Sequence, residues 1–128
     1  MAGGPGATVL NMTDEDSFHA NMDEYQQRAF AAQSKAAQAF GRLLDLAESH
    51  DSGQTRHIAQ FLAATYDGSA FSFDLFDLRV LDIAISDDML CCLDALRWGR
   101  ADLYELVPDG DKRMQAVIAQ WRLRPIST

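Results

Sequence analysis

The sequence predicts an all-α protein, with a single domain of five or six helices. Three observations predict it: apolar residues recur at spacings of three and four, residues that cap helices precede those stretches, and glycine or proline follows them. The chain has 128 residues, of which 48% are hydrophobic and 23% charged, as is ordinary for one globular domain.

The first element is expected to be a long helix that follows an N-terminal arm. Residues 1–12 hold three glycines and one proline without a period, so we expect a disordered arm before a domain covering residues 13–128. Thr13 precedes three acids and is the expected N-cap of a helix over about 14–49. Its apolar residues follow one another in steps of four and three: Phe18, Met22, Tyr25, Ala29, Ala32, Ala36, Ala39, Leu43 and Leu46.

These steps form a heptad seam. A single helix carrying the whole seam would be too long for a globular domain of this size to cover. The helix would be roughly 54 Å long, whereas a globule of this size has a radius of gyration of about 14 Å. Either the helix breaks near Ser34 or Gly41, or its first half leaves the globule and packs against a partner. In the second case the chain forms a homodimer through Phe18, Met22, Tyr25, Ala29 and Ala32.

A second helix is expected over Gln54–Tyr66. Asp51 or Ser52 supplies its cap, and Gly68 lies just beyond its end. Ile58, Phe61 and Leu62 give it one apolar face.

The stretch from Phe71 to Trp98 is the densest mixture of large apolar residues and carboxylates. We expect its apolar side chains to be buried, its acids to lie at the rim and the other helices to pack around it. Asp74 is the expected cap of a short helix reaching Leu81, although alternation within the stretch is also compatible with short strands. Ser86 should cap a further helix that ends at Gly99 and buries Met89, Leu93 and Leu96.

The C-terminal part predicts a turn of helix, a tight turn and a last helix. Asp102–Val107 is compatible with one helical turn, and Pro108-Asp109-Gly110 has turn chemistry. The last helix is expected over Asp111–Leu123, before Pro125. Its docking face repeats at helical spacing and consists of Met114, Val117, Ile118 and Trp121.

Charge is unevenly distributed along the chain. The net charge is −8, and the region Asp67–Asp111 alone carries eleven acids and three bases, whereas four bases and no acid follow it. This balance argues against direct binding of nucleic acid, which requires Lys and Arg to displace counterions, and favours a basic protein surface as partner. The basic tail could instead lie against the acidic centre and neutralise it.

The sequence contains few motifs that are typical of enzymes. It lacks a glycine-rich nucleotide loop and the spacings typical of zinc ligands, so we expect a non-enzymatic protein without cofactor or metal. Cys91 and Cys92 are adjacent and cannot form a disulfide framework, which suits a reducing compartment. We expect one of them in the core and the other partly exposed. Neighbouring acids should raise the pKa of the thiols. Without an apolar run that could span a membrane or a secretory signal, the expected location is the cytoplasm.

The segments SGQTRHIAQFLAATYD, FDLFDLRVLDIAISDDML and AQWRL resemble a family known only as a domain of unknown function. The resemblance covers about Phe40 to Leu123, and Thr65-Tyr66 stand where that family usually has two tryptophans. The matching residues are Gly53-Gln54, Arg56, Phe61-Leu62, Phe73-Asp74-Leu75, Leu78, Asp82, Ala84-Ile85, Asp87-Asp88-Met89-Leu90 and Gln120-Trp121-Arg122. The resemblance implies small proteins of proteobacterial genomes, plasmids and integrative elements, among which inhibitors of host defence, including anti-CRISPR proteins, are common.

The resulting expectation is a protein that acts by binding a basic partner, such as a nucleic-acid-binding defence complex that it inhibits. The candidate contacts are the acids Asp74, Asp77, Asp82, Asp87 and Asp88, with Trp98 and Tyr104 as aromatic anchors. The alternative is a small homodimeric regulatory or structural protein assembled through the helix seam.

Overall fold

A computed structural model describes the backbone of residues 14–126 and the side chains from residue 21 onward. The described chain contains four α-helices and two short 3₁₀ helices and no strand, so the all-α prediction is confirmed. Contacts divide the chain into two compact units, one ending at Ala31 and one beginning at Ala32. Within the described residues, no helix is both long enough and apolar enough to cross a bilayer.

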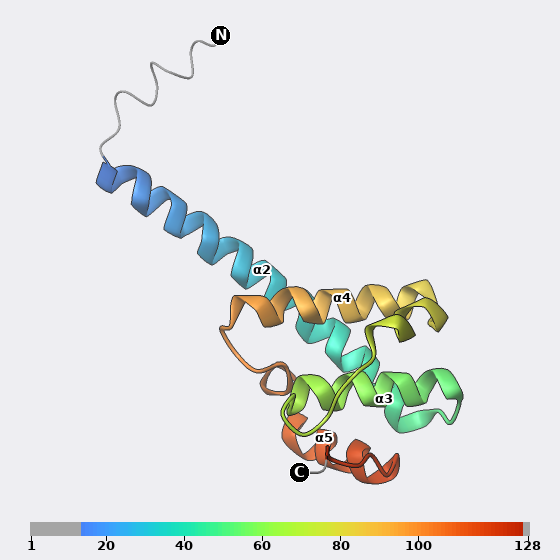
Figure 1. Cartoon of the computed structure of the whole chain (residues 1–128). Helices are drawn as coiled ribbons and strands as arrows, with labels where there is room; N and C mark the ends of the chain where they lie inside the picture. The colour runs from blue at the N-terminus through green and yellow to red at the C-terminus, as the bar shows by residue number, and fades with distance from the viewer. Residues whose placement is uncertain (1–13, 127–128) are drawn as a thin grey trace. The chain divides into compact units, whose positions relative to one another are not determined.

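Helix α2, Asp14–Ser49, is continuous over its 36 residues (Figure 1), and neither Ser34 nor Gly41 interrupts it. The expected cap Thr13 lies outside the described residues, as does the side chain of Phe18. Of the other residues expected in the dimer seam, Met22 and Tyr25 are 41% and 55% exposed, whereas Ala29 and Ala32 are 2% and 6% exposed. The two alanines are therefore already buried within one chain.

The core lies in the second unit and is centred on the last four turns of α2. Its α2 residues are spaced by one, three or four positions, so they form a wide apolar stripe: Ala36, Ala39, Phe40, Leu43, Leu44 and Ala47. The small alanines permit close approach of neighbouring helices, while Phe40, Leu43 and Leu44 are fully buried. Burial of each large side chain contributes about 1.5–3 kcal/mol relative to exposure. The chain is thus organised around α2 and not around Phe71–Trp98.

Helix α3, Gly53–Tyr66, begins one residue before the expected Gln54 and ends at Tyr66, as the sequence predicts. Ser52 is its N-cap, and the Thr55 backbone N–H donates to Ser52 Oγ at 3.2 Å. Ile58 and Leu62 are fully buried and join the core, while Asp67 follows the last turn.

Helix α4, Ile83–Trp98, starts four residues earlier than the sequence predicts, with Asp82 rather than Ser86 as N-cap. Ser86 lies inside the helix, where its hydroxyl donates to the Ile83 carbonyl at 3.0 Å. Gly99 ends α4 in the left-handed conformation, as expected, with φ 66°. The buried line is Met89, Cys92 and Ala95 rather than Met89, Leu93 and Leu96, since Leu93 is only partly buried and Leu96 is 44% exposed.

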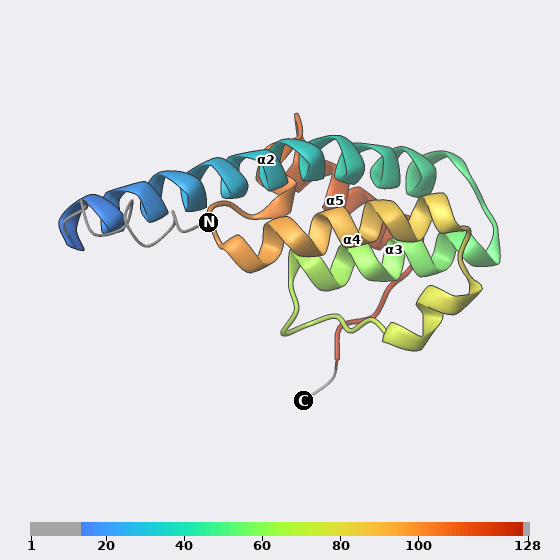
Figure 2. The same ribbon diagram turned by 90° about the horizontal axis from the view of Figure 1, so that it is seen from above.

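The C-terminal elements are η2, Leu103–Leu106, and α5, Gly110–Gln120, which pack against each other and on α3 (Figures 1 and 2). Met114 and Val117 of α5 are fully buried, which confirms the predicted docking face. Helix α5 ends before the expected Leu123, so Pro125 plays no part in stopping it.

Candidate partner-binding surface

The five predicted contact acids lie on or beside η1, Leu75–Val80, and the first turns of α4. Asp74 is the N-cap of η1 and accepts from the Phe76 backbone N–H at 2.9 Å, which confirms the predicted cap. Asp82 is paired with Gln54 of α3: the Asp82 backbone N–H donates to Gln54 Oε1 at 2.5 Å, and Gln54 Nε2 donates to Asp82 Oδ2 at 3.3 Å. These hydrogen bonds give neither Asp74 nor Asp82 a positively charged partner.

The other three acids differ in how far they are engaged. Asp88 is neutralised, since Arg42 donates to both of its oxygens at 2.8 and 3.0 Å. Asp77 Oδ2 lies 3.1 Å from His57 Nδ1, which is buried and makes no hydrogen bond in the described structure. Asp87 is exposed, and no hydrogen bond or ion pair within the described residues engages it. Four of the five acids therefore have no arginine or lysine partner among the described residues.

Large apolar side chains lie between these acids, exposed to solvent. Leu75, Phe76, Val80 and Ile83 are 67%, 70%, 65% and 74% exposed. The expectation that Phe71–Trp98 buries its apolar residues is wrong for these four. Between Leu75 and Ile83, Leu81 alone is buried. Leu81 is buried in the core and Leu78 is partly buried against it, whereas the other four side chains extend into solvent. We call the four exposed residues with Asp74, Asp77, Asp82 and Asp87 the acidic–apolar face.

An apolar groove adjoins this face. Its volume is about 250 Å³, and apart from Thr65 and Ser72 its lining is apolar: Phe61, Ala64, Gly68, Phe71, Phe73, Leu75, Leu78, Leu93 and Leu96. Phe61 and Phe73 meet edge to face across it, with ring centroids 5.4 Å apart. Asp74 lies between two lining residues in the sequence, and Asp94, which pairs with Arg97, directly follows a third.

The two predicted aromatic anchors are half-buried rather than exposed. The Tyr104 ring packs edge to face on Tyr66, with centroids 5.2 Å apart. Trp98 lies beneath the Arg97 guanidinium, 5.2 Å from the ring centroid, and Arg97 also pairs with Asp94 at 2.7 Å. Neither aromatic residue lines the apolar groove.

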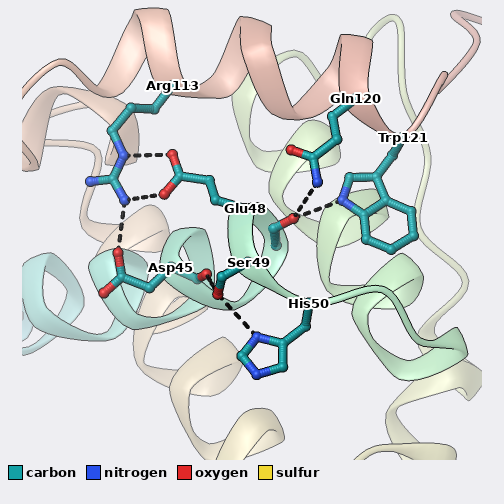
Figure 3. A network of polar contacts seen from close by, with 8 residues as sticks. Asp45, Glu48, Ser49, His50, Arg113, Gln120 and Trp121 are labelled. Carbon is teal, nitrogen blue, oxygen red and sulfur yellow. Dashed lines mark hydrogen bonds and ion pairs between the residues drawn. The ribbon is translucent and has the colours of Figure 1, made fainter.

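A polar network joins α5 to the end of α2 (Figure 3). Arg113 donates to both oxygens of Glu48 at 2.7 and 2.9 Å, and to Asp45 at 2.9 Å. These bonds lower the pKa of Glu48 and raise that of Arg113. Gln120 and Trp121 both donate to the Ala47 carbonyl, at 3.3 and 2.9 Å. Arg113 thus binds acids of α2, and the described structure records no ion pair between the basic tail and the acids of Asp67–Asp111, so that alternative is wrong.

The same network contains a serine beside a histidine, but not in an activating arrangement. The Ser49 hydroxyl donates to the Asp45 carbonyl at 2.5 Å, so His50 Nδ1, 3.0 Å away, is placed to donate to Ser49 rather than to accept its proton (Figure 3). Cys92 is buried and Cys91 half-buried, as expected, and burial, followed by the Asp88 charge, raises the pKa of Cys92 to about 12. Within the described residues, His, Cys, Asp and Glu form no cluster that could hold a metal.

Fold and surface together define an all-α protein with an acidic, partly apolar face. The sequence profile of the family described as "Family of unknown function (DUF7673)" matches residues 37–122, so the chain belongs to this family. This confirms the resemblance and nearly reproduces its expected range. No curated protein and no solved structure is significantly similar to the chain.

Proposed function

We propose that the protein is a non-enzymatic binding module for a basic protein partner. The partner places apolar side chains into the groove beside Leu75, and its Lys and Arg side chains pair with the acids of the acidic–apolar face. The observation that carries this proposal is the exposure of Leu75, Phe76, Val80 and Ile83 among carboxylates that pair with no arginine or lysine of the described residues. Contiguous exposed apolar side chains rimmed by charge are typical of protein-interaction surfaces.

The test uses three single variants of the full chain. Leu75→Ser removes the groove's exposed rim, and Asp87→Lys reverses an acid that makes no internal contact in the described structure. Leu90→Ser is the matched control, because Leu90 is 54% exposed on α4 and lies outside the groove. Asp74 is left intact, since its side chain caps η1 and its loss would cost about 1 kcal/mol of stability.

Each variant is used to capture proteins from a bacterial lysate, with thermal unfolding as the check on folding. We expect a basic protein to be retained by wild type and by Leu90→Ser. Its capture should fall at least tenfold with Leu75→Ser, which removes an apolar contact, and with Asp87→Lys, which removes a charge pair. Capture equal to that of wild type by folded Leu75→Ser and folded Asp87→Lys would rule the surface out.

A narrower form of the proposal names the partner class: a nucleic-acid-handling defence complex of the cytoplasm, such as a CRISPR effector. Carboxylates arranged on a rigid helical surface can occupy Lys and Arg that otherwise hold a phosphate backbone. In that case the protein inhibits target cleavage by the effector in vitro, and added nucleic acid competes with it. If a molar excess of the protein does not affect cleavage, the hypothesis of a nuclease inhibitor is wrong. The more general hypothesis of a binding module is then tested by the capture experiment alone.

The second candidate function is a homodimer assembled through the first turns of α2. It is favoured by the exposure of Met22 and Tyr25, to which Phe30, 70% exposed, adds a further apolar side chain. Light scattering tests it directly: a monomer at micromolar concentration is incompatible with the seam, and a dimer that Met22→Lys converts to monomer supports it.

A further inference from the structure

A pocket lined by three arginines lies where the C-terminal segment meets α3. Its volume is about 340 Å³, and it contains Arg56, Arg122 and Arg124 together with the polar side chains of Gln60 and Ser72. The remaining lining is Ala63, Phe71, Leu123 and Ile126. Such a pocket has the size of small-molecule sites, which combine apolar walls with a few convergent polar groups.

Specific contacts assemble this pocket from three separate segments. The Arg56 guanidinium donates to the Trp121 carbonyl at 3.2 Å, and Trp121 is itself anchored by its bond to Ala47. The Ile126 backbone N–H donates to the Ala70 carbonyl at 2.6 Å, which ties the C-terminal segment to the loop carrying Phe71. The arginines are therefore brought together by packing and not by proximity along the sequence.

Arg122 occupies a backbone position that normally belongs to glycine. It has φ 52°, and the bonds from Arg122 N to Ala119 O and from Leu123 N to Ile118 O form a Schellman motif at the end of α5. A left-handed conformation is unfavourable for a residue with a Cβ, so arginine at this position strains the backbone.

The pocket also keeps its positive charge, in a chain with a net charge of −8. Elsewhere three arginines pair with acids: Arg42 binds Asp88, Arg97 binds Asp94, and Arg113 binds Glu48. Within the described residues no carboxylate pairs with Arg56, Arg122 or Arg124. Three like charges around one depression repel each other, and a bound anion relieves that repulsion.

We propose that this pocket binds a small organic molecule through its phosphate group. A tetrahedral phosphate offers enough acceptor oxygens for several guanidinium forks, with Gln60 and Ser72 as further donors, whereas a carboxylate offers only two oxygens. Phe71, Leu123 and Ile126 form the wall for the apolar body of the ligand. None of these residues belongs to the acidic–apolar face, although Phe71 and Ser72 also line the apolar groove. Variants at Arg122 and Arg124 distinguish this site from the proposed function, because neither arginine lines the groove.

The experiment titrates the full chain with phenyl phosphate and follows the arginine side-chain signals by two-dimensional NMR. Phenol, benzoate and inorganic phosphate are the comparison ligands, and Arg122→Gly and Arg100→Gln are the matched variants. Both variants remove one positive charge, but Arg100 lies outside the pocket and is exposed. Glycine at position 122 also removes the backbone strain, so this variant remains folded and melts no lower than wild type.

We expect saturable binding of phenyl phosphate with shifts at Arg56, Arg122 and Arg124, weaker binding of inorganic phosphate and benzoate, and none of phenol. Arg122→Gly should weaken phenyl phosphate binding about tenfold or more through loss of charged hydrogen bonds, and Arg124→Gln should act similarly, while Arg100→Gln stays within about twofold. No saturable binding, or equal affinity of Arg122→Gly and Arg100→Gln, would overturn the site. Equal affinity for benzoate would overturn the phosphate assignment, and equal affinity for inorganic phosphate would overturn the organic ligand.

Discussion

At the scale of single residues, Arg113 joins α5 to two acids at the end of α2. We expect Arg113→Gln to lower the free energy of unfolding by about 1 kcal/mol at neutral pH, because a bidentate pair and a third bond are lost at a partly exposed site. Lys112→Gln, which removes the same charge from the neighbouring exposed position, should change it far less. Urea denaturation measures both variants.

The loss of stability caused by Arg113→Gln should also depend on pH. The pKa of Glu48 is lowered from 4.5 in the folded protein, so the pair stabilises the fold above that pH and loses its effect as pH falls through the lowered value. The difference between wild type and Arg113→Gln should therefore shrink below about pH 4.5. A difference that stays constant down to pH 3 would show that the arginine acts through packing alone.

The two thiols should react differently despite being neighbours. Burial, with the Asp88 charge, raises the pKa of Cys92 from 9.0 to about 12, whereas Cys91 is half-exposed. We expect iodoacetamide at mild alkaline pH to modify one thiol per native chain, and none in Cys91→Ser, as counted by mass spectrometry. Because the unfolded chain releases the Cys92 proton above 9.0 and the folded one holds it, stability should also fall as pH rises from 9 toward 12. Modification of both thiols at equal rates in the native chain would contradict the burial.

At the scale of elements, the junction between η2 and α5 depends on one glycine. A Cβ at Gly110 would lie 1.7 Å from the Tyr104 carbonyl oxygen, a backbone atom that cannot move aside without displacing η2. We expect Gly110→Ala to lower the free energy of unfolding by more than about 3 kcal/mol.

Gly53→Ala is the matched comparison, because Gly53 is the first residue of α3 and a Cβ there meets nothing within 4 Å. It should raise the free energy of unfolding by about 0.5–1 kcal/mol through helix propensity and a less flexible unfolded chain. Thermal unfolding measures the melting temperatures of Gly110→Ala and Gly53→Ala. Similar melting temperatures would show that the turn at Gly110 accommodates a Cβ at little cost in free energy.

At the scale of the whole molecule, the two compact units predict that the second folds without the first. The core cluster begins at Ala36 and includes residues of α3, α4, η2 and α5, all within the unit that starts at Ala32. We expect a chain starting at Ala32 to unfold cooperatively, within about 5 °C of the full chain. Circular dichroism measures the transition, and a truncated chain without a cooperative melt would show that the first unit is required.

Much of the fold could be predicted from local signals. Ser52 as cap of α3, Gly99 as the end of α4 and the turn at Gly110 follow from propensities that act within one or two residues. The candidate surface was predicted only in part: its acids were found, but the exposure of Phe76 and Ile83 was not. Their alternation with acids every few residues was a usable signal, since a short segment that must keep several carboxylates in water cannot bury all its apolar side chains.

The sequence by itself determined where helices form, which faces of α3 and α5 are apolar, and the acidity of the region around η1, because periodicity, capping and charge are properties of neighbouring residues. Only the tertiary structure decided that α2 is the centre of the core, that α4 begins at Ile83, and that Arg56 meets Arg122 and Arg124 in one pocket. The reason is physical: burial and the meeting of distant side chains depend on which elements face each other, and that choice is made by the packing of the whole chain.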